Sequence, residues 1–410
     1  MAAPGENIRI NSARLWDSLE EMALIGPGVA GGCNRQTLTD ADGEGRHLFQ
    51  RWCEAAGMTM GVDTMGNMFA TRAGTDPDAL PVYMGSHLDT QPTGGKYDGV
   101  LGVLGALEVV RSMNDLGIKT KHPVVVTNWT NEEGARFAPA MLASGVFAGI
   151  HTEDYAKGRR DMDGKVFGEE LKRIGWEGTE KVGARKMHAM LELHIEQGPM
   201  LEAEGKTIGV VTHGQGLWWL EITLTGKDAH TGSTPMHLRV NAGLGMARIT
   251  ERVHQIAMSH QPNAVGAVGQ VKVFPNSRNV IPGSVTLSVD LRAPDDGQLL
   301  DMDAALRAAC ERIAAAHGVT VGVEQVVYFP PQPFTPHLVE AVRANAADLG
   351  YSAMDVVSGA GHDAVYLARV APAAMIFVPC ADGISHNEIE DAEPAHLEAG
   401  CNVLLRAMLA

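Results

Sequence analysis

Side chains that can bind divalent metal ions recur along the sequence, each at the edge of an apolar run. They are His87, Asp98, Glu133, His194 and His386. His87 begins the tripeptide His87-Leu88-Asp89, in which one ring nitrogen can bind a metal while Asp89 accepts a hydrogen bond from the other nitrogen and fixes the tautomer. Asp98 lies in the glycine-rich stretch GGKYDG, where a short carboxylate can reach a metal. These residues predict a site of nitrogen and oxygen ligands.

Two adjacent carboxylates, Glu132 and Glu133, follow the β-branched run VVVTNWTN. Neighbouring carboxylates repel each other unless a cation is present or they point apart. One of them can bind a metal while the other acts as general base toward a water that the metal activates. The pair therefore favours hydrolytic chemistry.

Each of these residues also has an ordinary interpretation when it is taken alone. Asp98 could cap the following helix, the two glutamates could begin an exposed helix, and a lone histidine between apolar residues is usually a core residue. The joint pattern is more specific. Three histidines, one terminal carboxylate and one bridging carboxylate suit a pair of divalent ions ~3.5 Å apart.

The elements that must position these side chains alternate between strand and helix. LPVYMGS, HPVVVTNWT and LELHIEQGP are typical of buried strands that run into loops, and VLGVLGALEVVRSM is typical of a helix with a small-residue face. Such alternation predicts an α/β domain with its functional groups at the carboxyl ends of the strands. We expect a mixed sheet flanked by helices.

The pattern changes near residue 212. LWWLEITLTG alternates like a half-buried strand, and a helix is expected at about 238–258, strands near 267–274 and 284–292, and a helix around 299–316. This order predicts a smaller α+β unit with two helices on one face of its sheet. Because SGAGHDA and GISHNE follow it, we expect a discontinuous catalytic domain, 1–211 and 330–410, interrupted by an inserted domain at 212–329.

The composition of the chain limits which partners the protein can bind and in which cellular compartment it is expected. The chain has 410 residues and a net charge of -16, so it lacks the basic patch that nucleic acid or an anionic membrane needs. Its apolar windows are shorter than the roughly 18–20 residues that span a bilayer. The five cysteines form no C-x-x-C pair, and the opening MAAPGENIRI has no basic-then-apolar leader. We expect a cytoplasmic protein that binds neither nucleic acid nor membrane.

Seven motifs between residues 85 and 388 carry a resemblance to a known family. They are GSHLDTQPTGGKYDG, TNEEGARF, ELHIEQGP, AHTGSTPM, SRNVIPG, SGAGHDA and SHNE. In this order they resemble the N-carbamoyl-L-amino-acid hydrolases, which are grouped with β-ureidopropionase and allantoate amidohydrolase among the co-catalytic metallo-aminoacylases and metallopeptidases. The resemblance implies two divalent metals per subunit, zinc or manganese, cobalt or nickel, and an inserted lid domain that forms a homodimer.

The resemblance also implies roles for individual residues. Asp98 would bridge the metals, His87 and His194 would complete one, and Glu133 and His386 the other. Glu132 would be the general base, and Asp89 would orient His87.

The substrate contacts that the resemblance implies come from both domains. On the lid, Asn279 and Arg292 would bind the substrate carboxylate, and His230 would stabilise the oxyanion, serving the neighbouring subunit. In the catalytic domain, Gln197 would contact the ureido group, and Gly361 could present backbone amides, although its stretch could equally be a plain tight turn.

These roles imply hydrolysis of N-carbamoyl-L-amino acids to the amino acid, ammonia and carbon dioxide. Allantoate amidohydrolase and β-ureidopropionase activity stay open, because they need the same metals and the same carboxylate grip. A metallo-dipeptidase fits HIEQGP and SRNVIPG less well. A non-catalytic, metal-binding dimeric module is the alternative from another class, and loss of a ligand or of Glu132 would favour it.

Overall fold

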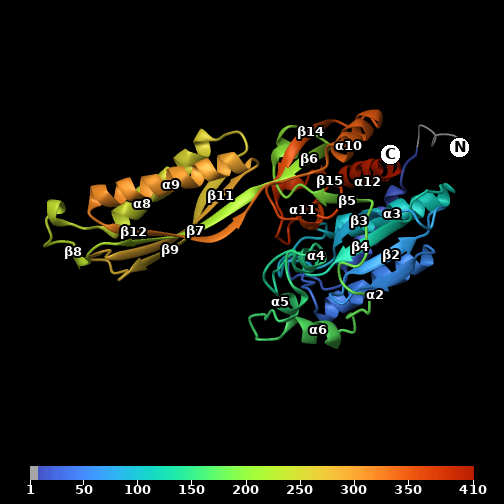
Figure 1. The fold of residues 1–410 in the computed structure, drawn as a ribbon, viewed down its shortest axis with the longest axis horizontal. Helices are drawn as coiled ribbons and strands as arrows, with labels where there is room; N and C mark the ends of the chain where they lie inside the picture. Colours follow the sequence, from blue (N-terminus) through green and yellow to red (C-terminus); the bar gives the residue numbers. More distant parts are fainter. Residues whose placement is uncertain (1–7) are drawn as a thin grey trace. The chain divides into compact units, whose positions relative to one another are not determined.

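The computed structural model describes residues 8–410, in two compact units (Figure 1). The first unit comprises the described residues up to Thr212 together with Pro333–Ala410, and the second is His213–Gln332. These limits lie close to the boundaries expected from the sequence. Residues 1–7, on which the expectation about a leader mostly rests, lie outside the described residues. No described helix is long and apolar enough to cross a membrane.

The first unit is built on a nine-stranded mixed sheet with the order β1-β2-β4-β3-β5-β15-β6-β13, and β14 pairs with β6. The strands are β1 (Thr59–Val62), β2 (Met68–Arg72), β3 (Val82–His87), β4 (Val124–Trp129), β5 (Ala189–Ile195), β6 (Ile208–Gly214), β13 (Gln332–Pro333), β14 (Ala353–Ser358) and β15 (Ala373–Val378). The four central strands β4, β3, β5 and β15 are parallel and buried along their whole length. Such burial requires cover on both faces.

Helices supply that cover. Those of the first unit are α1 (Ser12–Ala23), α2 (Asp40–Ala55), α3 (Val100–Asp115), α4 (Leu142–Phe147), α5 (Glu153–Lys157), α6 (Phe167–Arg173), α7 (Met200–Ala203), α10 (Pro336–Asp348), α11 (Asp363–Leu367), α12 (Pro394–Leu409) and the 3₁₀ turn η2 (Ala381–Gly383). α3 and α12 pack against each other and on the central strands, while α4 packs on α11. The expected mixed sheet flanked by helices is confirmed.

The second unit has a four-stranded antiparallel sheet of order β12-β7-β11-β9, a two-stranded pair β10-β8 and two long helices. Its elements are β7 (Gly216–Thr225), β8 (Ala229–His230), η1 (Met236–Leu238), α8 (Ala242–Ser259), β9 (Val265–Phe274), β10 (Val280–Ile281), β11 (Ser284–Ala293), α9 (Asp296–His317) and β12 (Thr320–Phe329). The buried side chains of β7 and β11 pack with those of α8 and α9 in a core of their own. β12 was not predicted from the sequence pattern, and half of its residues are exposed.

Candidate metal centre

The predicted ligands of the first unit gather at the carboxyl ends of its parallel strands. His87 is the last residue of β3, His194 is the last but one of β5, and Glu132 and Glu133 follow the end of β4. Because β4, β3 and β5 run parallel as neighbours, their carboxyl ends meet at one edge of the sheet. Asp98 reaches the same edge from the loop before α3.

Asp98 presents its two carboxylate oxygens to two different groups of ligands. Oδ1 lies 3.2 Å from His194 Nε2 and 3.7 Å from His87 Nε2. Oδ2 lies 3.4 Å from His386 Nε2, which is in turn 3.4 Å from Glu133 Oε2. Within each group, the ligand atoms lie within 4.8 Å of one another, so each group can hold a metal ion. The five predicted ligands therefore form two candidate clusters that share Asp98.

Backbone carbonyls fix the buried histidine rings. His87 Nδ1 bonds to the carbonyl oxygen of Asp89 at 2.8 Å, and His194 Nδ1 bonds to that of Ile195 at 2.8 Å. With Nδ1 as the donor, Nε2 of each ring carries the lone pair that faces the cluster, and that of His194 accepts the backbone amide of Gly99 at 3.1 Å in this structure. This is the tautomer that a metal ligand needs.

The sequence predicted that the side chain of Asp89 accepts a hydrogen bond from His87, but the backbone of Asp89 accepts it instead. The Asp89 carboxylate lies 4.0 Å from His87 Nδ1, too far for a hydrogen bond, and the Asp89 backbone oxygen makes the contact instead. The carboxylate accepts the backbone amides of Glu132 and Glu133, each at 3.3 Å. Asp89 thus orients His87 through its main chain and the two glutamates through its side chain.

The carboxylates of the site are buried and crowd one another. Burial, together with the charges of Asp363 and Glu133, raises the pKa of Glu132 well above its usual value. Burial and the charge of Asp98 raise the pKa of Glu133 in the same direction. Buried negative charges at this density are stabilised by a cation. The set of imidazole nitrogens and carboxylate oxygens suits zinc, manganese, cobalt or nickel, so the residues present fit a divalent metal centre.

The three predicted histidine ligands differ in their affinity for a proton. Burial opposes a charge on His194, but its bond to Asp98 outweighs burial and raises the pKa of His194 to about 9. The contact of His386 with Asp98 raises the pKa of His386. Burial lowers the pKa of His87 to about 4, so the contact with Asp98 favours positive charge on His194 and His386 but not on His87.

A cavity of about 120 Å³ opens onto the clusters, and the predicted substrate-binding residues of this unit, Gln197 and Gly361, line it. It is lined by Asp98, Glu132, Glu133, Ala140, His194, Gln197, Ala360, Gly361, His362 and His386. Gln197 donates its side-chain amide to Asp98 Oδ2 at 2.8 Å and lies 3.3 Å from His386 Nε2. Gly361 lies at the wall, where an added Cβ would come 2.8 Å from Met141 Cε.

Two buried residues of this site, Glu192 and His362, were not predicted from the sequence. Glu192, His194 and His362 form a third group of closely spaced ligand atoms. His362 Nε2 has no hydrogen-bond partner although the residue is 1% exposed and lines the cavity. The signals were present: Glu192 is two positions before His194, hence on the same face of β5, and His362 directly follows Gly361.

The three predicted lid residues do not come together within one chain. His230 in β8 pairs with Val280 in β10, and Thr231 N donates to the Asn279 carbonyl at 2.9 Å, so His230 and Asn279 are neighbours. β10 leads into the first residue of β11, a strand of ten residues, whereas Arg292 is at its last but one position. At about 3.3 Å per residue, this places Arg292 roughly 25 Å from the beginning of β11. Asn279 and Arg292 of one chain are therefore far apart, and the roles expected for them stay predictions.

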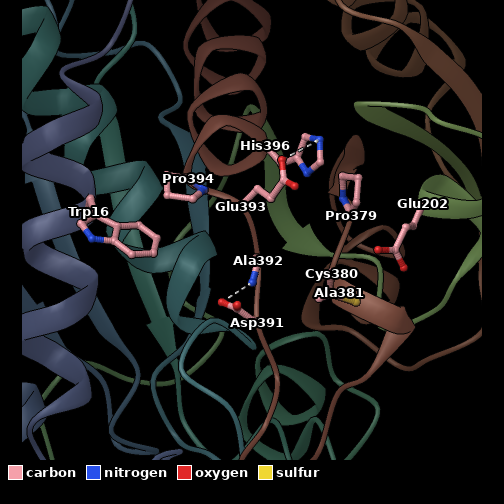
Figure 2. A pocket seen from close by; sticks show the side chains of 10 residues that line it. All are labelled: Trp16, Glu202, Pro379, Cys380, Ala381, Asp391, Ala392, Glu393, Pro394 and His396. Atoms are coloured by element: carbon pink, nitrogen blue, oxygen red, sulfur yellow. Dashed lines mark hydrogen bonds and ion pairs between the residues drawn. The ribbon is translucent and has the colours of Figure 1, made fainter.

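A second cavity of the first unit, of about 420 Å³, contains none of the predicted site residues. It is lined by Trp16, Glu202, Pro379, Cys380, Ala381, Asp391, Ala392, Glu393, Pro394 and His396 (Figure 2). Three of its polar side chains have near neighbours as partners: Glu393 lies 4.0 Å from His396, and Asp391 accepts the amide of Ala392 at 2.9 Å. The chemistry therefore centres on the smaller cavity.

Comparisons with known proteins agree with this architecture. The chain belongs to peptidase family M20/M25/M40, which matches residues 83–410. An N-carbamoyl-L-amino-acid amidohydrolase of Rhizobium meliloti is 68% identical over 409 residues, which cover 100% of this chain and 98% of the relative. A solved amidase of the hydantoinase/carbamoylase family from Burkholderia multivorans is 58% identical, with a TM-score of 0.96 and 98% of each chain covered.

A more distant relative acts on a different compound. A ureidoglycolate hydrolase of Arabidopsis thaliana is 32% identical over 409 residues, which cover 97% of this chain and 86% of the relative. The resemblance drawn from the motifs is confirmed at the level of the family, which is metal-dependent. The chain is a hydrolase that acts on C–N bonds.

Proposed function

We propose that this chain hydrolyses the carbamoyl C–N bond of N-carbamoyl-L-amino acids with the help of two divalent metal ions. The observation that carries the proposal is the position of Asp98, whose two oxygens face two separate groups of ligands with Glu132 beside them. The 68% identical relative named as an N-carbamoyl-L-amino-acid amidohydrolase supports this substrate class.

In this proposal His87, Asp98 and His194 would hold one ion, and Asp98, Glu133 and His386 would hold the other. When bound, the ions supply Lewis-acid polarisation of the carbamoyl carbonyl and lower the pKa of water. Zinc, manganese, cobalt and nickel all accept this ligand set, and their availability decides among them.

Glu132 is the proposed general base. Its Oε2 lies 3.4 Å from His87 Nε2, and the side chain lines the cavity without belonging to either candidate cluster. Burial disfavours the charge of Glu132, which strengthens its affinity for a proton. Glu132 takes the proton of the attacking water and passes it to the leaving nitrogen. Gln197 and Gly361 line the same cavity and are the proposed contacts for the ureido group.

His230 is suited to stabilise the oxyanion. Its Nδ1 accepts the backbone amides of Gly232 and Ser233 at 3.0 and 3.2 Å, so the neutral ring carries its proton on Nε2. A ring held in this tautomer presents a hydrogen-bond donor, which an oxyanion requires. Asn279 is a neighbour of His230, because its carbonyl accepts the backbone amide of Thr231, the next residue in the chain. We propose that Asn279 acts together with His230.

Arg292 is the proposed grip on the substrate carboxylate, for which its planar fork is suited. In the free protein it pairs with Asp290, with Nη2 at 2.8 Å from Oδ2. Because Arg292 and the pair His230 and Asn279 lie at opposite ends of β11, they are proposed to serve different active sites of a homodimer.

The second unit offers an edge for such a dimer. β9 ends the sheet order and has ten residues, among which the apolar side chains of Val265, Val271 and Phe274 are exposed. A long apolar edge strand favours association with another chain. The proposed assembly is therefore a homodimer through the lid domain.

A substrate panel tests the proposed reaction. Metal-loaded protein would be assayed for ammonia release from N-carbamoyl-L- and D-amino acids, N-carbamoyl-β-alanine, allantoate and ureidoglycolate, and for formate release from N-formyl amino acids. We expect the highest kcat/KM for N-carbamoyl-L-amino acids. A strong preference for allantoate or ureidoglycolate would overturn the substrate, and no turnover of any ureido compound with two metals bound would overturn the enzymatic function.

A further inference from the structure

Glu390 lies behind Asp98, outside both candidate metal clusters. It is 5% exposed, and its Oε1 accepts the backbone amides of Tyr97 at 2.9 Å and of Asp98 at 3.2 Å. The neighbouring Gly95 leaves space for it, since a Cβ there would come 2.0 Å from the Glu390 carboxyl group. Glu390 thus fixes the main chain of the segment that carries the proposed bridging ligand.

Ser385 holds the carboxylate of the same ligand. Its Oγ is 2.9 Å from Asp98 Oδ2 and 3.1 Å from Glu390 Oε2. Asp98 is therefore held at its backbone nitrogen by Glu390 and at its side chain by Ser385, and the two holding groups contact each other. A carboxylate that must direct one oxygen to each of two clusters cannot rotate freely, and these contacts restrict its rotation.

The same pair controls a second ligand, because Ser385 directly precedes His386 in the chain. His386 has a positive φ of 54°, and half of its side chain is exposed. Packing therefore does little to fix this ring. The contacts of Ser385 and Glu390 tie the loop of His386 to the loop of Asp98.

We propose that Ser385 and Glu390 are positioning residues that aim Asp98 and His386 at the metal ions, although neither binds a metal itself. The inference rests on the proposed function, since it assumes that Asp98 and His386 are ligands. Hydrogen bonds to ligating side chains orient them, and removal of such a partner typically costs about 10–100-fold in metal affinity or activity.

The test uses two pairs of variants, each with a truncation and a conservative rescue. Ser385→Ala removes the hydroxyl, and Ser385→Thr restores it. Glu390→Ala removes both carboxylate oxygens, and Glu390→Gln restores an acceptor for the amides of Tyr97 and Asp98. Affinity for Zn²⁺ and for Mn²⁺ would be measured by competition with a chelator, and kcat and KM would be measured at saturating metal.

Two matched controls separate positioning from a general structural effect. Ser112 Oγ donates to the buried carboxylate of Glu108 at 2.8 Å, so Ser112→Ala removes a similar bond. Asp63 accepts the amides of Met65 and Asn67, so Asp63→Ala removes a similar buried anchor. Their expected effect is limited to stability, with metal affinity as in the wild type.

We expect Ser385→Ala and Glu390→Ala to weaken metal affinity about 10–100-fold and to lower kcat with little change in KM, and the rescue variants to recover most of the loss. Wild-type affinity in both truncations would overturn the inference alone, as would an equal loss in the two controls. A wild-type chain that binds neither metal would overturn the proposed function together with the inference. Should Glu390→Ala fail to fold, the Ser385 pair decides.

Discussion

Gly99 tests the position of His87 with a single added methyl group. Gly99 has a φ of 68°, and an added Cβ would lie 2.2 Å from Cε1 and 2.3 Å from Nε2 of His87. Since ordinary contact begins at 3.4 Å, Gly99→Ala forces the ring back by about 1.2 Å, and a shift of about 1 Å at a reacting centre costs roughly 100-fold in rate. Holding alanine at this positive φ costs a further 1–3 kcal/mol or so in stability.

Gly117 provides the control, because it has a φ of 66° and an added Cβ there meets nothing within 4 Å. Gly117→Ala therefore adds a methyl group at a positive φ without any displacement of His87. We expect both variants to lose about 1–3 kcal/mol of unfolding free energy in urea. Only Gly99→Ala should lose kcat/KM, by about 100-fold or more, and metal content. Wild-type kcat/KM and metal content in Gly99→Ala would refute the assignment of His87 as a ligand.

Three further predictions concern the base, the substrate grip and the metals. Glu132→Gln should nearly abolish turnover while elemental analysis finds unchanged metal content; loss of metal as well would show that the roles of Glu132 and Glu133 were divided wrongly. Arg292→Ala should raise KM at least about tenfold for every carboxylate substrate, and an unchanged KM would remove Arg292 from the site. Chelation should lower the thermal midpoint, since metal at one hundred times its Kd contributes about 2.7 kcal/mol to the folded state; an unchanged midpoint would contradict a cation among the buried carboxylates.

Three of the four central strands, β3, β4 and β5, could be predicted because apolar residues dominate their sequences, whereas β15 was not predicted. β3, β4 and β5 are buried on both faces, and a continuous β-branched or apolar run is the signal of such strands. β12 was missed where its exposed glutamate and glutamine residues interrupt the apolar pattern, although β9, the other edge strand, was predicted with more of its residues exposed. Edge strands are fixed by their partners more than by their own residues, and pairing partners cannot be read from local sequence.

The candidate ligands could be predicted because their residue types are chemically specific, whereas their supports could not. A histidine or an acidic residue can be recognised in the sequence as a possible metal ligand from its type alone. The backbone oxygen of Asp89, which holds His87, is an atom that every residue possesses. The distance between Asn279 and Arg292 was equally hidden, because thirteen positions of chain can form a compact turn or, as here, extend along β11.

Asp89 explains how two adjacent glutamates come to have different roles. Its Oδ1 accepts the amide of Glu132 and its Oδ2 accepts that of Glu133, so one carboxylate fixes both peptide groups of the turn. From this fixed turn, Glu132 extends to His87, with Oε2 at 3.4 Å from Nε2, while Glu133 extends to His386. The mutual repulsion of the two side chains is reduced because they point to different clusters. Asp89 therefore orients three of the groups on which the proposed reaction depends: His87, Glu132 and Glu133.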